Sequence, residues 1–440
     1  MATTNNLKDF LTDVADAIRE KEGSTGLINP QEFSERIRAI ETGGGGGAVA
    51  VVEKDVNFRD YDGTILHSYT KAEFLALKAL PELPTQPGLI CQEWNWALGD
   101  AQSYVQDYDT LEIGAIYITD DGKTRLYISI LSKSASTIPL MLSVGRTPVT
   151  IDWGDGNSKV LTSMGTYRTS NTYDSVGDYV ITIDVGEETE GSGYLINLGT
   201  GDSTESTLGS PSETLAYTSA LTKVELGYGL RVVQSYAFQS CPCLRSITIP
   251  KRVTRINAFA FKSCATLRYI ALPSTVTQID ESAFASLYGL HTFSLPDAVL
   301  TFGNNAFQYP YTLTRLNLPP NVSSLPTQLF SYDYRTRVLH IPSKVTSIAS
   351  YAFRGCTALS KVVIHGNPTI ASGAFDSCKG IGEYRFAGAT KVPTLSATSS
   401  LTVPAFCKIV VPDSLYDSWI KASNWSTYAS CIVKASEYPD

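Results

Sequence analysis

The sequence predicts a multidomain, mainly β protein whose C-terminal half is a repeat solenoid. Phenylalanine and proline each recur with a period of 23 residues, apart from one interval of 22 before the last phenylalanine. The residues that keep this period are Phe238, Phe261, Phe284, Phe307, Phe330, Phe353, Phe375, Pro250, Pro273, Pro296, Pro319 and Pro342. Because two residue types share one period, residues 221–386 are predicted to stack as coils. A run of five glycines and several short alternating segments divide the rest of the 440 residues into smaller domains.

Residues 1–42 are predicted to form a helical hairpin. Apolar residues follow helical spacing from Leu7 to Ile18, and Asn29 with Pro30 begins a second short helix. A hairpin this small buries little apolar surface, so we expect it to dock onto a larger assembly or to pair with copies of itself. Residues 43–50 contain the five glycines and are predicted to be a flexible linker.

Residues 51–131 are predicted to be a small α+β module. Residues 56–58 have strand character, residues 71–80 have helical character, and a proline follows at position 81. The turn Asp120-Asp121-Gly122 lies between two strand-like segments, residues 115–119 and 124–130, which predicts a β-hairpin. Trp94 and Trp96 suit either a small core or stacking on a sugar, and burial preferences favour the core.

Residues 132–186 are predicted to be a β-sandwich, because residues 140–144, 149–153 and 179–185 read as short alternating strands. The turn from Trp153 to Gly156 and the later Gly-Asp-Tyr at 177–179 resemble the polycystic-kidney-disease type of immunoglobulin-like domain, which implies an Ig-like fold. Asp152 and Asp155 could hold calcium, but carboxylates in such turns usually bond backbone amides, and one turn supplies too few oxygens. Residues 187–220 are predicted to be a linker.

Each repeat of the array follows one pattern, which begins L-x-x-I-x-I-P. In the first unit Leu244, Ile247 and Ile249 point inward from a strand, and Pro250 ends it. After the proline, each unit continues with V-x-x-I and then A-F. The pattern resembles the BspA-like subclass of bacterial surface leucine-rich repeats, which implies a leucine-rich-repeat solenoid. Four cysteines fall on the cysteine position of that motif, where a small buried side chain fits: Cys241, Cys264, Cys356 and Cys378.

The array departs from its pattern in one unit, where Leu329, Asp333 and Thr336 replace the usual alanine, cysteine and leucine. We expect this unit to be distorted. Residues 387–440 leave the pattern and resemble the C-terminal cap that follows such repeats. A cap is needed because the last coil otherwise exposes its apolar edge.

Sequence features exclude several function classes. The four histidines are isolated from possible nucleophiles, and phosphate-binding and dinucleotide-binding motifs are missing, so we expect no enzyme, no catalytic residues and no cofactor. The cysteines fit no zinc spacing, and we expect no metal site. No apolar run approaches the length of a membrane span, and no recognition helix or aromatic sheet motif indicates nucleic-acid binding.

Charge points to the array as the binding region. Residues 221–386 contain 16 Lys and Arg against 7 Asp and Glu, although the whole chain carries a net charge of −8. An anionic polymer or glycan is therefore the expected ligand. Stacked tyrosines suit a sugar, but packing between coils explains them equally well. The expected ligand-binding residues, in two strand columns and one turn column, are Arg245, Arg268, His291, Arg337, Tyr269, Arg315, Lys361, Tyr288, Tyr311 and Tyr334.

Residues 56–64 and 119–125, together with the N-terminal helices, resemble modules of phage and prophage virion proteins. This resemblance implies a tail-fibre, tail-tip or head-decoration protein of the virion. It would contact other virion proteins through its helices, form a homo-oligomer and attach to a host surface glycan or wall polymer. The alternative is a bacterial surface adhesin with BspA-like repeats, for which residues 1–22 offer no secretory signal. A glycan-cleaving enzyme would need two facing carboxylates, which the strand positions do not offer.

Overall fold

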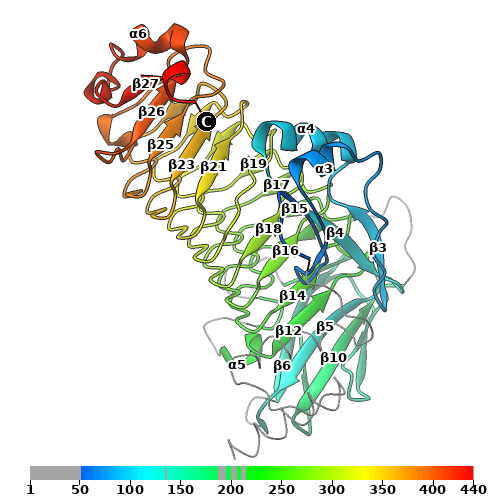
Figure 1. The fold of residues 1–440 in the computed structure, drawn as a ribbon. Coiled ribbons are helices and arrows are strands. Elements are labelled where there is room, and N and C mark those ends of the chain that lie inside the picture. Colours follow the sequence, from blue (N-terminus) through cyan, green and yellow to red (C-terminus); the bar gives the residue numbers. More distant parts are fainter. Residues whose placement is uncertain (1–50, 134–135, 187–194, 200–205, 210–214, 440) are drawn as a thin grey trace, which may run out of the picture. The chain divides into compact units, whose positions relative to one another are not determined.

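A computed structural model describes residues 51–133, 136–186, 195–199, 206–209 and 215–439. The predicted helical hairpin and its glycine linker lie outside the described residues. Residues 53–440 belong to one compact unit, and this unit is mainly β (Figure 1). None of the helices among the described residues combines the length and hydropathy needed to cross a bilayer.

The first sheet has four strands in the order β2-β1-β4-β3, with β4 parallel to β1 and antiparallel to β3. Its core contains Phe58, Phe74 and both Trp94 and Trp96, so the prediction that the tryptophans are core residues is confirmed. The helix predicted over residues 71–80 is one short helix, closed at its start by a capping box between Thr70 and Glu73. The elements are β1 (Val56–Arg59), β2 (Ile65–Tyr69), α3 (Lys71–Leu75), β3 (Leu89–Trp94), α4 (Leu98–Tyr108) and β4 (Leu111–Thr119).

The hairpin predicted at residues 115–130 is wrong. Gly122 does form a turn, with φ +72° and its N–H donating to the Thr119 carbonyl at 3.2 Å. The strands on either side then enter different sheets, because β5 (Thr124–Ile130) pairs with strands of the two following regions. A Cβ at Gly122 would lie 1.6 Å from the Tyr228 ring, so the array packs directly against this turn.

Residues 124–198 contribute to two sheets that share one core. One sheet has the order β14-β12-β5-β10-β7-β8 and the other β11-β6-β9. The larger sheet is not closed within this region, because β12 and β14 belong to the repeat array. An Ig-like domain therefore stays a prediction. The elements are β6 (Thr137–Val144), β7 (Val149–Asp152), β8 (Ser158–Leu161), β9 (Gly165–Thr172), β10 (Gly177–Asp184) and β11 (Ile196–Leu198).

The repeat array is a β-solenoid, as predicted. Where neighbouring coils form strand pairs, the pairs are parallel and 23 residues apart, or 22 in the last repeat. The repeat phenylalanines stack with ring centroids 4.8 to 6.2 Å apart. Cys264 and Cys378 are buried and donate their thiols to the Phe238 and Phe353 carbonyls at 3.0 Å. The elements before the irregular unit are α5 (Leu215–Thr218), β12 (Leu221–Glu225), β13 (Val232–Val233), β14 (Ser246–Thr248), β15 (Arg255–Ile256), β16 (Tyr269–Ala271), β17 (Gln278–Ile279), β18 (Thr292–Ser294) and β19 (Thr301–Phe302).

The array is irregular near the unit that departs from the pattern. Residues 315–317 form no strand, so the main strand ladder is interrupted between β18 and β21. Asp333 is buried there, and its carboxylate accepts the backbone N–H groups of Arg335 and Thr336. The elements that follow are β20 (Ser324–Leu325), β21 (Val338–Ile341), β22 (Ser347–Ile348), β23 (Lys361–Ile364), β24 (Thr369–Ile370) and β25 (Glu383–Arg385).

The C-terminal region continues the parallel sheet before it caps it. β26 pairs in parallel with β25, and β27 pairs in parallel with β26. Trp419 and Trp425 are buried against Phe386, which covers the apolar end of the array. The elements are η3 (Thr398–Ser400), β26 (Lys408–Val411), η4 (Asp413–Leu415), α6 (Tyr416–Trp419), η5 (Ser426–Tyr428), β27 (Ile432–Lys434) and η6 (Ala435–Glu437).

The first sheet packs onto the strand face of the array, with β4 next to β14, β16 and β18 (Figure 1). Asn95 Nδ2 donates to the Leu272 carbonyl at 3.0 Å, and Trp96 Nε1 donates to the Leu295 carbonyl at 2.8 Å. Tyr104 adds a third bond from its hydroxyl to the Leu318 carbonyl at 3.0 Å. The module of residues 51–119 therefore covers part of the surface that the sequence suggested was open to solvent.

Candidate ligand-binding surface

The first predicted strand column is an exposed basic row. Arg245, Arg268, His291 and Arg337 are all exposed. Their coils are neighbours, since the His291 N–H donates to the Arg268 carbonyl at 2.9 Å and Thr314 donates to His291 at 3.0 Å. Within the described part of the chain, the three guanidinium groups contact no carboxylate. Arg245 and Arg268 lie on adjacent coils, and Arg337 lies three coils beyond Arg268, after His291 and Thr314. These unpaired cations provide attachment points for a polyanion along the array.

The second predicted column does not face solvent along its length. Tyr269 is only 3% exposed and lies against Gly63 and Gly114 of the docked module, which corrects the expectation that it is available to a ligand. Lys361 is half-buried and lies 3.4 Å from the Glu383 carboxylate. The repeat period placed these residues in the correct strand column. The sequence did not predict that the module of residues 51–119 covers part of this column.

Arg315, in the same column, is held by the module. Its Nε lies 3.0 Å from the Glu53 carboxylate and its Nη1 3.4 Å from Glu112, and it also donates to two backbone carbonyls. Glu112 is buried and is bonded by Arg59 at 2.5 Å. Burial raises the pKa of the Glu112 carboxyl, while Arg59 and Arg315 act in the opposite direction. Arg315 thus links the module to the array, and its charge is largely neutralised.

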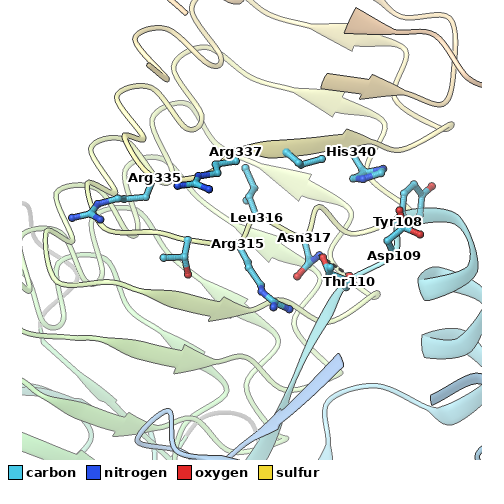
Figure 2. A pocket seen from close by; sticks show the side chains of 11 residues that line it. Tyr108, Asp109, Thr110, Arg315, Leu316, Asn317, Arg335, Arg337 and His340 are labelled. Carbon is cyan, nitrogen blue, oxygen red and sulfur yellow. Dashed lines mark hydrogen bonds between the residues drawn. The ribbon is translucent and has the colours of Figure 1, made fainter. Parts of the chain in front are cut away.

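A pocket of about 480 Å³ opens where the strand ladder is interrupted (Figure 2). One wall comes from the end of α4 and the start of β4, and the other wall from two coils of the array. In Figure 2 the hydrogen bond between Asn317 and Thr110 joins the two walls, and Arg335 extends away from them. The lining residues are Tyr108, Asp109, Thr110, Thr314, Arg315, Leu316, Asn317, Arg335, Arg337, Val338 and His340.

The pocket combines cations with neutral polar groups. The guanidinium groups of Arg335 and Arg337 are exposed and have no partner among the described residues. The one lining carboxylate, Asp109, is paired with Lys71 at 2.7 Å. Asn317 Nδ2 donates to the Thr110 carbonyl at 2.8 Å, whereas its Oδ1 accepts no bond within the described residues. The exposed guanidinium groups therefore allow the pocket to bind an anionic group.

A pair of histidines borders the pocket on the side of α4. His340 Nδ1 lies 3.2 Å from His365 Nε2, and the Tyr108 ring meets both imidazoles edge-on. Burial, together with the smaller effect of the neighbouring His365, lowers the pKa of His340 to about 4, so His340 is neutral at physiological pH. The pair thus contributes packing and hydrogen bonding to the pocket, while its positive charge comes from the arginines.

The predicted turn column is an exposed stack of aromatic rings. Tyr288 and Tyr334 lie on either side of Tyr311, with ring centroids 5.1 Å apart on each side. Tyr288 is 45% and Tyr334 41% exposed. Tyr309 and Tyr332 form a second stack at 5.0 Å. The rings pack on each other and stay at the surface, so filling the core does not account for them.

Asp152 and Asp155 form the expected turn contacts. Asp152 Oδ1 accepts the Gly154 N–H at 2.9 Å, and Asp155 accepts the Asn157 N–H at 3.0 Å and Asn171 Nδ2 at 2.6 Å. Among the described residues, no group of three or more His, Cys, Asp or Glu side chains is placed to hold a metal ion.

Sequence reasoning missed half of the pocket. Tyr108, Asp109 and Thr110 come from the module, more than 200 residues before the coils that they face. Arg335 was also missed, because it lies between strand columns. One sequence signal did mark the place, since the unit predicted to be distorted, residues 329–336, lies beside the interrupted ladder.

Comparison with known families agrees with the coil geometry. Residues 211–337 and 335–403 match the model of the BspA type leucine rich repeat region, in 6 copies. These residues are therefore BspA-like leucine-rich repeats, as predicted. The match does not extend to residues 51–186. No curated protein matches the chain.

Solved structures with similar coils come from several bacteria. A leucine rich cell surface protein from Faecalibacterium prausnitzii is 20% identical over 40% of this chain and 62% of that chain, with a TM-score of 0.28. A leucine rich repeat protein from T. pallidum is 27% identical over 38% and 75%, with a TM-score of 0.33. A leucine-rich repeat protein from Bacteroides ovatus is 18% identical over 43% and 73%, with a TM-score of 0.23.

Fold and surface together define this chain as a protein with BspA-like leucine-rich repeats. A docked module covers part of the strand face of the repeats, and an open, arginine-lined pocket lies at the edge of that module.

Proposed function

We propose that this chain is a non-enzymatic binding protein of the bacterial cell-surface adhesin type, and that it attaches to an anionic glycan or wall polymer through its array. The unpaired arginines carry this proposal. Arg335 and Arg337 border an open pocket, and Arg337 also belongs to the exposed row that continues to Arg245. A polymer that follows the row can place one anionic group in the pocket.

The alternative setting is a phage virion. It rests on the resemblance of residues 1–130 to virion modules, and the helical segment that would dock there, residues 1–42, lies outside the described residues. The BspA-like repeats favour the surface-adhesin setting. Antibodies against the chain separate the two, because an adhesin is labelled on the outer surface of the producing cells, whereas a virion protein is labelled on purified phage particles and attaches to them through its N-terminal helices.

The charge row is tested with the full chain and inorganic polyphosphate as the probe. We expect binding to weaken as salt is raised, because screening shortens the reach of exposed charges. Arg245→Ser combined with Arg268→Ser and Arg337→Ser should weaken it by about tenfold, which is about 1.4 kcal/mol. Isothermal titration or fluorescence anisotropy gives the affinity.

The matched control removes the same number of charges elsewhere. Lys133, Lys391 and Lys421 are exposed on the sandwich region and the C-terminal region, outside the coils that carry the row. Their triple serine variant should bind polyphosphate within about twofold of the wild type, a difference of about 0.4 kcal/mol. Equal losses in the two triple variants would mean that net charge alone attracts the polymer, and the proposed surface would be wrong.

A further inference from the structure

The five surface tyrosines form one platform on three successive coils. Tyr288, Tyr311 and Tyr334 make the outer stack, and Tyr309 and Tyr332 make the inner one. The two stacks touch where the Tyr309 and Tyr311 rings meet edge-on at 5.8 Å. We call these five residues the tyrosine platform. Each stack advances by one ring per coil, so the platform repeats along the axis of the array.

The coil does not require tyrosine at these positions. Tyr309 and Tyr332 have φ of 63° and 66°, in the left-handed region that bulky side chains rarely adopt. Other coils place Ser263, Ser286 or Gly355 at the same phase. Two large side chains therefore occupy turn positions where other coils carry serine or glycine, so the coil itself does not explain the aromatic rings.

The platform leads directly into the pocket. Tyr334 is followed by Arg335, and Arg335 and Arg337 both line the pocket. On the next coil the Arg354 guanidinium lies 6.0 Å from the centre of the Tyr332 ring, a cation–π contact. A chain lying over the tyrosines thus meets cations at the end of the platform.

Ring spacing distinguishes between classes of polyanion. The rings are 5.0 to 5.1 Å apart along each stack, close to the length of one pyranose residue in an extended glycan. The exposed basic row has the same coil period, about 4.8 Å between strands. Stacked bases repeat at about 3.4 Å along one strand, which matches neither feature. The rings of each stack face one another, so a glycan along the axis meets their edges and hydroxyl groups, which suit the oxygen atoms of a sugar.

We propose that the tyrosine platform binds the sugar rings of an acidic polysaccharide that lies along the solenoid axis with one sugar per coil, while the arginine row and the pocket hold its acidic groups. This inference rests on the proposed function and narrows the ligand to a glycan. It differs from a general polyanion surface in one respect: sugar rings, and not charge alone, determine the affinity.

The test compares two polyanions on the full chain. Polygalacturonate carries a carboxylate on every sugar, and inorganic polyphosphate carries charge without sugars. In the variant Tyr288→Ala, Tyr311→Ala, Tyr334→Ala we expect the affinity for polygalacturonate to fall about tenfold and the affinity for polyphosphate to stay within about twofold. Retained polyphosphate binding also shows that the variant is folded.

Oligogalacturonates of increasing length provide a second measurement. Affinity should rise with each added sugar until the oligomer spans the three platform coils and the basic row, and then level off. An affinity that stays constant from the shortest to the longest oligogalacturonate would contradict binding of one sugar per coil.

Other outcomes overturn the inference. If the tyrosine variant loses nothing on polygalacturonate, or the wild type binds polyphosphate but no polygalacturonate, the platform is not a sugar site, although the proposed polyanion surface survives. If a single-stranded oligo-dT binds more tightly than either polymer and depends on the same tyrosines, the ligand is a nucleic acid. If the wild type binds neither polyphosphate nor polygalacturonate, both this inference and the proposed function are wrong.

Discussion

At the scale of single residues, Asp333 connects a sequence irregularity to the candidate site. It replaces a cysteine of the repeat pattern, and it is buried beside the coil in which the strand ladder is interrupted. Burial raises the pKa of this carboxyl, and only hydrogen bonds from Arg335 and Thr336 oppose the effect. A titratable group is thus retained in the wall from which Arg335 and Arg337 extend.

Asp333→Asn should stabilise the protein at neutral pH. A carboxyl whose pKa is raised by folding favours the folded state below its unfolded pKa, and this stabilisation is lost as the pH rises through the folded pKa. Asparagine keeps the acceptor oxygen without the charge, so the free energy of unfolding at pH 7 should rise. Urea unfolding at pH 7 and pH 3.5 measures it.

The gain should shrink at the lower pH, where Asp333 is protonated in both states. A variant that is equally stabilised at both pH values, or destabilised at pH 7, would show that the buried charge is not what strains this coil. Cys264→Ser changes the residue at the same repeat phase of a regular coil. It serves as a control for the effect of changing a well-packed buried side chain at this position.

At the scale of elements, the repeat phase was readable from the sequence, but the docking of the module was not. Phe238 and its counterparts occupy equivalent core positions, so their period predicts the coils correctly. Tyr269 obeys the same period and is nevertheless covered, because its environment depends on β4, more than 150 residues earlier. The local period of the sequence predicts on which face of the array a side chain lies. It does not predict which other part of the chain covers that face.

Helix α4 was missed for a local reason. Its N-cap, Ala97, makes no side-chain capping bond, and Gly99 lies in its first turn. Both features weaken the usual start signal. Packing compensates, since Tyr104 and Tyr108 bury their rings between the helix and the array. Because α4 provides Tyr108 and leads into Asp109 and Thr110, missing this helix also meant missing one wall of the pocket.

The docking of α4 should be weakened by acid. Burial lowers the pKa of His340 to about 4 and also lowers that of His365, and both lie against Tyr108. A lowered folded pKa means that the stabilisation is present above the unfolded value, near 6.5, and is lost as the pH falls through the folded value. The other charges that act on His340 are Asp109, Lys361 and Lys71.

His340→Gln should flatten this dependence. We expect the wild-type melting temperature to fall between pH 6.5 and pH 4, and the variant, which cannot be protonated there, to fall less. His291→Gln changes an exposed histidine of the same array and serves as the control. An identical pH profile for wild type and His340→Gln would contradict the assignment of the acid sensitivity to this contact.

At the scale of the whole molecule, the candidate site is shared between regions that the sequence separated into domains. The larger sheet of the sandwich region continues into the array through β12, and the module bonds to the array through Arg315 and Asn95. The predicted linker at residues 187–220 also contains β11. Residues 53–440 therefore form one compact unit, and the pocket exists only where module and array meet.

Our central claim is that an anionic polymer binds at this junction. The decisive measurement is the affinity of the full chain for polygalacturonate after Arg335→Ser and Arg337→Ser, compared with Lys391→Ser and Lys421→Ser. We predict about a tenfold loss for the arginine pair and less than about a twofold change for the lysine pair, since only the former lines the pocket. Unchanged affinity in the arginine variant, with the fold intact by thermal unfolding, would contradict the claim.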